Sequence, residues 1–312
     1  MLKFGIYFFY WHDISNDNII PNGIRTSPER FKCEINFIKK NFKIVSITEA
    51  INCIKENLII RFEKPLAVIC FDDGFKSLLT NVKPLLIKNN IPFTMFLNSA
   101  FLDQAYLSES ILCEYISKFM SKKEIKVNFD FVHNRHSLWS FLKKTSSKHQ
   151  LDKLQECVNK RWINKSHYLS WNDLNMLNNK LITICNHTSH HLWMPNLNKA
   201  DQEDQINASH LKLKKISNYV KLLAIPFGSD DSYDKNTLSL IKKYSDHILI
   251  KANGSINHQM NKNLLIIERI GMSNNKPKIQ EHIHNRLREK NMIFKMKKIL
   301  VKVLIKSKLY KQ

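Results

Sequence analysis

Glycine is scarce in this sequence, with 6 residues in 312, and acidic residues are outnumbered by basic ones. The 49 lysines and arginines against 27 aspartates and glutamates give a formal net charge of +22 at pH 7. Such a charge would suit nucleic acid, a lipid surface or a phosphate-bearing substrate. Lysine, asparagine and isoleucine are abundant throughout, however, which is typical of a coding bias. Since no nucleic-acid-binding motif accompanies the charge, we expect no nucleic-acid partner.

The sequence also lacks C-x-x-C pairs and long apolar runs. Its six cysteines are Cys33, Cys53, Cys70, Cys113, Cys157 and Cys185. Several lie in apolar patterns, so we predict buried, reduced thiols rather than disulfides or a zinc knuckle. No run approaches about 18 apolar residues, and we expect no transmembrane helix. The first residues do not resemble a secretory signal, so we expect a cytoplasmic protein.

Strand and helix patterns alternate along most of the chain. Short apolar runs predict strands at residues 4–11, 43–46, 66–71, 92–97, 181–185, 222–225 and 264–267. Helix starts are predicted after Ser27, which can cap a helix that has Pro28 at its first position, and after Thr48. Alternation of this kind predicts parallel βαβ units and the α/β class.

Two segments depart from this alternation. Residues from about 101 to 168 are polar, lysine-rich and helical in pattern, which predicts a helical insertion over one rim of the sheet or barrel. Residues 289–312 form a basic amphipathic tail, in which an apolar stripe faces away from most of the lysines. A helix of this kind can lie on an anionic membrane surface or pack back on the preceding domain, which we predict to span residues 1–288.

A short apolar run ends in two adjacent carboxylates, Asp72 and Asp73, followed by a glycine. Neighbouring residues of a strand point to opposite faces, so the two carboxylates should have different roles. Carboxylates at the end of a buried strand are costly unless a partner compensates their charge. A metal ion would provide that compensation, and its other ligands should lie elsewhere in the chain.

A second apolar run is followed by Asn186-His187-Thr188-Ser189-His190-His191. His187 and His191 are four residues apart, so in a helical or tight turn both can face one point, a spacing that favours them over His190. Imidazoles and a carboxylate are the usual protein ligands of a catalytic zinc. Thr188 could orient a ligand through a hydrogen bond. Spacing alone leaves a purely structural role for these histidines open.

These segments together resemble the polysaccharide deacetylase family, the NodB-homology group similar to carbohydrate esterase family 4. The residues 71–74 match its F-D-D-G motif, and residues 187–191 match its H-[ST]-x-x-H motif. Residues 225–228, Ile-Pro-Phe-Gly, are similar to its third motif, and residues 11–14 and 27–31 resemble the entry of one large branch. The resemblance runs from about residue 6 to 272 and implies a distorted (β/α) barrel. In such a barrel the site lies at the carboxyl ends of the strands.

Carried over by position, the resemblance implies that Asp73, His187 and His191 bind a divalent metal ion. Zinc is the first choice, with cobalt, nickel and manganese as alternatives. Asp72 would be the general base, which takes the proton from the attacking water.

The sequence departs from the family pattern at two positions. Ile225 stands where many members have an arginine that orients the base, and we assign this role to Arg269. Many members also have a late histidine that protonates the leaving amine; no match occurs here, and we assign this role to His12. A surface salt bridge for Arg269 and a structural cap for His12 are the alternatives.

The resemblance implies a metal-dependent hydrolase that removes the N-acetyl group from an amino sugar. We predict a bacterial surface polysaccharide or its lipid-linked precursor as the substrate, and a peripheral location at the inner face of the membrane through the tail. The alternatives are a deformylase or other C–N hydrolase of a lipid-linked amino sugar, or a catalytically impaired glycan-binding homologue. A two-carboxylate glycosidase is excluded, because adjacent Asp72 and Asp73 cannot flank a bond as carboxyls about 5–9.5 Å apart do.

Overall fold

A computed structural model of the protein describes residues 5–58, 62–102, 106–128, 152, 155–156, 158, 166–252, 254 and 263–285. The chain divides into two units, Met1–Asn275 and Lys276–Gln312. In the second unit, residues 279–285 are helical. The predicted tail, residues 289–312, lies outside the described residues.

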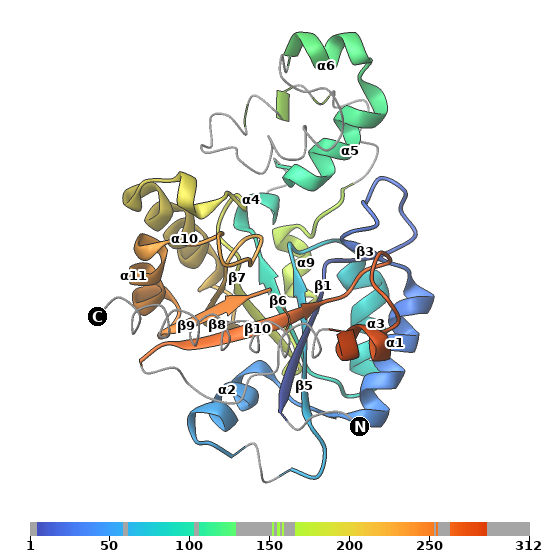
Figure 1. Ribbon diagram of the computed structural model, residues 1–312, viewed down its shortest axis with the longest axis vertical. Coiled ribbons are helices and arrows are strands. Elements are labelled where there is room, and N and C mark those ends of the chain that lie inside the picture. The colour runs from blue at the N-terminus through green and yellow to red at the C-terminus, as the bar shows by residue number, and fades with distance from the viewer. Residues whose placement is uncertain are drawn as a thin grey trace, which may run out of the picture. The chain divides into compact units, whose positions relative to one another are not determined.

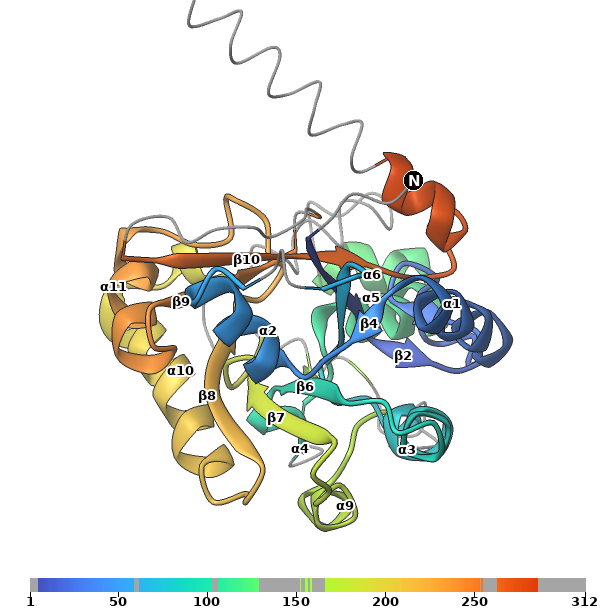
Figure 2. The same cartoon turned by 90° about the horizontal axis from the view of Figure 1, so that it is seen from below.

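In the described part of the first unit, seven parallel strands close into a barrel (Figure 2). They are β1 (Ile6–Trp11), β5 (Leu66–Asp72), β6 (Phe93–Leu97), β7 (Ile182–Asn186), β8 (Tyr219–Ala224), β9 (Ile248–Lys251) and β10 (Leu265–Gly271). The order is β1-β10-β9-β8-β7-β6-β5, and β5 pairs back with β1 from Leu66 opposite Ile6 to Phe71 opposite Trp11. A short strand β4 (Lys43–Ile44) pairs in parallel with the first residues of β5. Separately, β2 (Asp13–Ile14) pairs with β3 (Arg25–Thr26). The predicted α/β barrel is therefore confirmed.

The barrel interior is filled by alternate apolar residues of its strands. These include Phe8 of β1, Val68 of β5 and Ile250 of β9. Helix α2 (Ile47–Lys55) packs its apolar face on this cluster and lies across the amino-terminal end of the strands (Figure 2). The cap of α2 is Ser46, which forms a capping box with Glu49, so the prediction of Thr48 as the cap is wrong.

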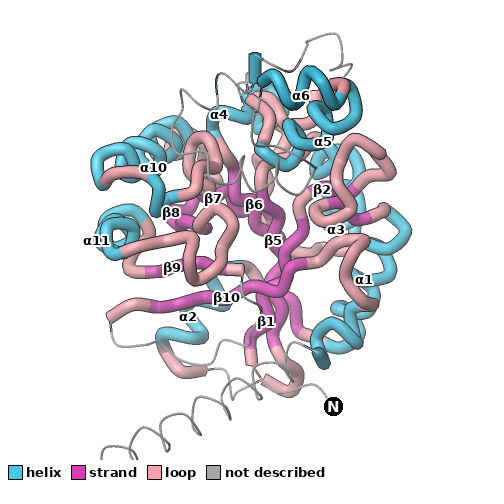
Figure 3. Tube along the Cα trace, turned by 45° about the horizontal axis from the view of Figure 1, so that its top comes forward, coloured by secondary structure: helices cyan, strands magenta, loops and turns pink. Residues whose placement is uncertain are grey.

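Further helices surround the strands on the outside (Figure 2 and Figure 3). They are α1 (Pro28–Asn41), α3 (Lys83–Lys88), α9 (Trp171–Asn175), α10 (Lys199–Leu213) and α11 (Lys235–Tyr244). A π-helical turn, η2 (Leu78–Val82), precedes α3, and a 3-10 turn, η4 (Met194–Asn196), precedes α10. Helix α1 begins as predicted: the Ser27 side chain accepts a hydrogen bond from the Arg30 N–H, and Pro28 is its first residue.

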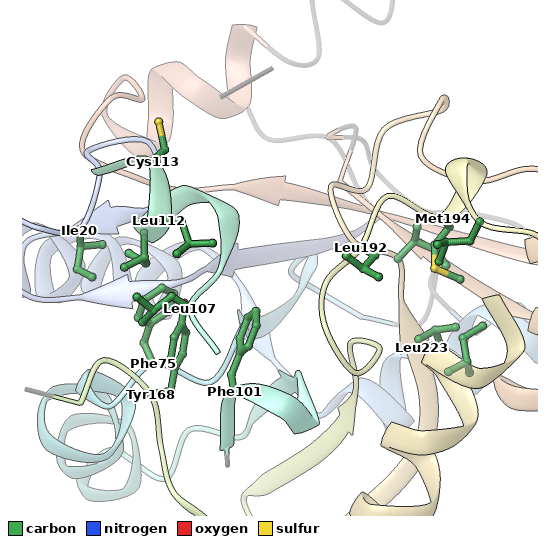
Figure 4. Packing of buried hydrophobic residues seen from close by; sticks show 14 of the residues in the cluster. Ile20, Phe75, Phe101, Leu107, Leu112, Cys113, Tyr168, Leu192, Met194 and Leu223 are labelled. Carbon is green, nitrogen blue, oxygen red and sulfur yellow. The ribbon is translucent and has the colours of Figure 1, made fainter. Parts of the chain in front are cut away.

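The described part of the predicted insertion is helical. Helices α4 (Ser99–Leu102), α5 (Glu109–Phe119) and α6 (Lys122–Asn128) lie beyond the carboxyl ends of β6 and β7 (Figure 1). Their apolar side chains join those of Phe75 and Tyr168 in one buried cluster (Figure 4). This packing places the insertion at the end of the barrel where the sequence motifs are found.

Two further predictions concern the thiols and the membrane. The described cysteines are all free, and Cys70, Cys113 and Cys185 are buried, whereas Cys33 is exposed. Free thiols are thus confirmed for the described cysteines, although Cys33 is exposed and Cys53 only partly buried, and Cys157 lies outside the described residues. Within the described ranges, no helix combines the length and apolarity needed to cross a membrane.

Candidate metal centre

The end of strand β5 turns sharply between the two aspartates. Asp73 has a φ of 67° and Gly74 a φ of 75°, and the Gly74 N–H donates to the Asp72 carbonyl at 2.9 Å. A Cβ at Gly74 would lie 2.9 Å from a methyl group of Leu97, so a side chain does not fit there. The turn gives Asp72 and Asp73 different directions, as their different predicted roles require.

Four of the eight described non-glycine residues with a positive φ lie in the motif segments. Asp73, Thr188, His191 and Phe227 are non-glycine residues with φ values of 67°, 68°, 57° and 63°. Left-handed conformations are uncommon for such residues and cluster at functional sites when the surrounding structure holds them. All four lie in the three segments that carry the family-like motifs.

Asp73, His187 and His191 come together at the carboxyl ends of β5 and β7. The Asp73 Oδ1 atom lies 3.6 Å from Nε2 of His187 and 3.8 Å from Nε2 of His191, and the three ligand atoms all lie within 4.8 Å of one another. Tetrahedral ligands about 2.0–2.2 Å from zinc lie roughly 3.3–3.6 Å apart, close to these separations. Asp73 Oδ1 is buried and has no hydrogen-bond partner among the described residues. An orphaned carboxylate oxygen facing two imidazoles fits a divalent cation.

His187 is held in the form that a metal ligand needs. Its Nδ1 atom lies 2.8 Å from the Ala224 carbonyl oxygen, and its backbone N–H donates to the Leu97 carbonyl at 3.0 Å. Burial lowers the pKa of His187 to about 3, against the opposing effect of Asp72. The ring is therefore neutral, with Nδ1–H donating to the carbonyl and the Nε2 lone pair facing Asp73.

His191 has a different electrostatic environment. Its Nδ1 atom lies 3.0 Å from Oε1 of Glu109, a residue of the insertion. Burial lowers the pKa of His191, but Glu109 and Asp73 outweigh it and raise the pKa to about 9. At a pH below this value the ring is charged, and a metal ion must displace the proton on Nε2, the nitrogen that faces Asp73. Metal binding is therefore coupled to proton release.

Thr188 and His190 of the same motif are not part of the three-residue cluster. The His190 backbone N–H donates to Gln205 Oε1 at 3.0 Å, and the His190 ring packs edge-on against Tyr106. Within the described ranges, the Thr188 hydroxyl has no hydrogen-bond partner, whereas its backbone N–H donates to Asn186 Oδ1 at 2.8 Å and its carbonyl accepts from the Asn98 amide at 3.4 Å. The expectation that Thr188 orients a ligand through its hydroxyl is wrong.

Asp72 forms a bidentate ion pair with Arg269. The Nη1 and Nη2 atoms of Arg269 donate to the two carboxylate oxygens at 2.6 and 2.8 Å, and both side chains are buried. Nε of Arg269 donates to the Lys251 carbonyl at 3.2 Å, and the guanidinium lies between the rings of Tyr10 and Phe96. Burial raises the pKa of Asp72, but Arg269 outweighs it and holds that pKa below its ordinary value. Arg269 therefore lies in the interior of the site, and the surface salt bridge is ruled out.

His12 directly follows strand β1, at the same end of the barrel. Its ring packs edge-on against Tyr10, and its Nδ1 atom is buried without a hydrogen-bond partner in the described part of the chain. Burial raises the pKa of Asp73, and His191 and then His12 oppose this rise without outweighing it. The position is compatible with a proton donor, and the role remains a prediction.

Two residues of the site were missed by the sequence reasoning. Glu109 contacts His191, and the Asn98 amide donates to the His187 carbonyl. Asn98 directly follows strand β6, so the rule that polar residues at strand ends build the site could have found it. Glu109 lies in the insertion, and no local pattern marks it.

The chain was compared with known proteins. A model of the family described as polysaccharide deacetylase matches residues 60–246, more than half of the chain. No curated protein sequence matches it.

Solved structures share the fold at low identity. Streptococcus pyogenes deacetylase PplD in complex with acetate is 14% identical with a TM-score of 0.59, covering 91% of this chain and 98% of PplD. IcaB from Ammonifex degensii is 13% identical with a TM-score of 0.57, covering 87% and 93%. The polysaccharide deacetylase BC0361 from Bacillus cereus is 16% identical with a TM-score of 0.57, covering 89% and 69%. With the family match and the motif residues gathered at one end of the barrel, the chain belongs to the polysaccharide deacetylase family.

Proposed function

We propose that the protein is a metal-dependent hydrolase that removes the N-acetyl group from an amino sugar of a polysaccharide. The main support for the proposal is that two groups of side chains lie at the same end of the barrel. One is the buried group Asp73, His187 and His191, and the other is the ion pair of Asp72 with Arg269. A ligand set beside an ionised carboxylate is what hydrolysis of an unactivated amide requires.

Asp73, His187 and His191 would hold the metal ion, for which zinc is our first choice. When bound, a divalent ion polarises the amide carbonyl and lowers the pKa of a water molecule towards about 7. The neutral ring of His187 and the orphaned oxygen of Asp73 are the donor atoms that such an ion prefers.

Asp72 would take the proton from the attacking water. Its depressed pKa keeps it ionised and therefore able to accept a proton at neutral pH. Arg269 occupies both oxygens from one side and so fixes the plane of the carboxylate. His12, at the neighbouring strand end, would give a proton to the departing amine. In this proposal Asp72 of β5 removes a proton from water, and His12, which follows β1, delivers a proton to the amine.

The direct test is separate incubation of the purified protein with N-acetylated and with N-formylated glucosamine oligomers, and measurement of released acetate and formate. We expect acetate release that a chelator abolishes and added zinc restores. Formate release from N-formylated sugars alone would favour a deformylase instead. An absence of both products, with metal bound, would favour a glycan-binding homologue.

We further propose that the substrate is lipid-linked and that the basic tail, residues 289–312, holds the protein at the inner face of the membrane. The support is the amphipathic sequence pattern and the surplus of lysine. Deletion of residues 290–312 should move the protein from the membrane fraction to the supernatant, as measured by fractionation and immunoblotting. An unchanged distribution of the shortened chain would refute the anchoring role.

A further inference from the structure

The insertion contributes a carboxylate to the edge of the candidate metal centre. Glu109, the first residue of α5, is 8% exposed, and its Oε1 atom lies 3.0 Å from Nδ1 of His191. The other ring nitrogen of His191, Nε2, faces Asp73 at 3.8 Å. Glu109 thus approaches the ring through the nitrogen that does not face the ligand cluster, and the three-residue cluster does not include it.

Glu109 is held in place by the residue before it. The Ser108 N–H donates to the Tyr168 hydroxyl at 3.0 Å, and that hydroxyl donates to Ser108 Oγ at 2.9 Å. The Tyr168 ring packs against Phe75 and Phe101 with ring centroids 4.9 and 4.7 Å apart, and these side chains lie together in Figure 4. Phe75 follows the F-D-D-G turn directly, so the start of α5 is anchored to the segment that carries Asp73.

The two histidines differ in what their Nδ1 atoms face. His187 faces the neutral carbonyl oxygen of Ala224 at 2.8 Å, whereas His191 faces the carboxylate of Glu109. A second group that accepts the ring N–H fixes the tautomer and the ring orientation, and a carboxylate in that place makes the imidazole a more basic ligand.

We propose that Glu109 is a positioning residue for His191: its carboxylate is in ion-pair contact with Nδ1, without the angles of a hydrogen bond, and holds the ring so that Nε2 faces the metal ion. The insertion then has a direct function in metal binding besides covering one rim of the barrel. The inference rests on the proposed metal site but not on the identity of the substrate.

The test is metal affinity, measured by competition of Zn²⁺ between the protein and a chromophoric chelator. We expect Glu109→Ala to weaken binding about 10–100-fold, the usual effect of losing such a partner. Glu109→Gln keeps an oxygen acceptor and should weaken binding less than Glu109→Ala. The matched control is Glu29→Ala, which removes an exposed carboxylate from the first turn of helix α1 and should leave affinity unchanged.

Two readouts separate positioning from other roles. In the Co²⁺-substituted protein, the visible spectrum of Glu109→Gln should keep the band intensities of the same coordination number, and thermal unfolding should show a folded variant. Wild-type Zn²⁺ affinity in Glu109→Ala would overturn the proposal. A changed coordination number in folded Glu109→Gln would also overturn it, because Glu109 would then be a ligand. Since no substrate is used, a protein that binds metal as expected but releases no acetate would refute the proposed function and leave this inference intact.

Discussion

Replacement of Asp72 by asparagine should lower kcat for acetate release by about 10²–10⁴-fold, the usual contribution of a general base. Asparagine has nearly the same shape and can still accept one hydrogen bond from Arg269, but it cannot take a proton from water. KM should change little, because the carboxylate acts on the proton rather than on substrate binding. Steady-state kinetics with a soluble N-acetylated oligosaccharide would measure both constants.

The control for this variant is Asp204→Asn, which neutralises an exposed carboxylate on helix α10 and should keep wild-type kinetics. Loss of one negative charge from the protein is thereby separated from loss of the base. If Asp72→Asn retained kcat within a factor of two or three of wild type, another group would have to take the proton.

Replacement of Arg269 by methionine should lower the free energy of unfolding by about 3–5 kcal/mol, because it leaves the carboxylate of Asp72 buried without its partner. The substitution also removes the hydrogen bond from Arg269 to the Lys251 carbonyl and the contacts of the guanidinium with the rings of Tyr10 and Phe96. Urea unfolding followed by circular dichroism would measure the difference.

The double variant Asp72→Leu with Arg269→Met distinguishes a lost ion pair from lost packing. With both charges removed, most of the lost stability should return, because a buried ion pair replaced by apolar groups is often close to neutral. A double variant as unstable as Arg269→Met alone would mean that packing of the arginine, and not its charge, is what stabilises the barrel.

The four central residues of the site could be predicted from the sequence because each lies in a short segment directly after an apolar strand. Asp72 is the last residue of β5 and Asp73 follows it, while His187 and His191 follow β7. Parallel strands bring their carboxyl ends to one edge of a barrel, which brings these residues together, whereas their separate roles were assigned through the resemblance to the family.

Arg269 was placed in the correct region but in the wrong element. The apolar run ends at Ile267, which predicts that the strand ends there, whereas β10 continues to Gly271. A charged pair of residues, Glu268 and Arg269, interrupts the apolar pattern. Arg269 can nevertheless be buried inside the barrel because Asp72 supplies the opposite charge. Since this partner is distant in sequence, the local pattern around Arg269 does not predict its burial.

Helix α10 and Glu109 illustrate what the pattern does not predict. The buried face of α10 contains Gln202, Gln205 and Ser209, so the apolar periodicity that marks a helix is weak there. Gln202 is accommodated because Thr237 donates to its side-chain oxygen at 2.7 Å. Glu109 similarly has a long-range partner in His191. The burial and the role of such polar residues cannot be predicted from local sequence, because their partners are brought near only by the tertiary structure.

The most direct test of the metal centre is the metal content of the purified protein beside Asp73→Ala and Asp72→Ala, measured by inductively coupled plasma mass spectrometry after equal loading with Zn²⁺. Asp73→Ala removes the orphaned oxygen that faces both imidazoles, whereas Asp72→Ala removes a carboxylate engaged by Arg269. We expect about one metal ion per chain in the wild type and in Asp72→Ala, and a large loss in Asp73→Ala. Equal metal content in all three proteins would contradict the assignment of Asp73 as a ligand.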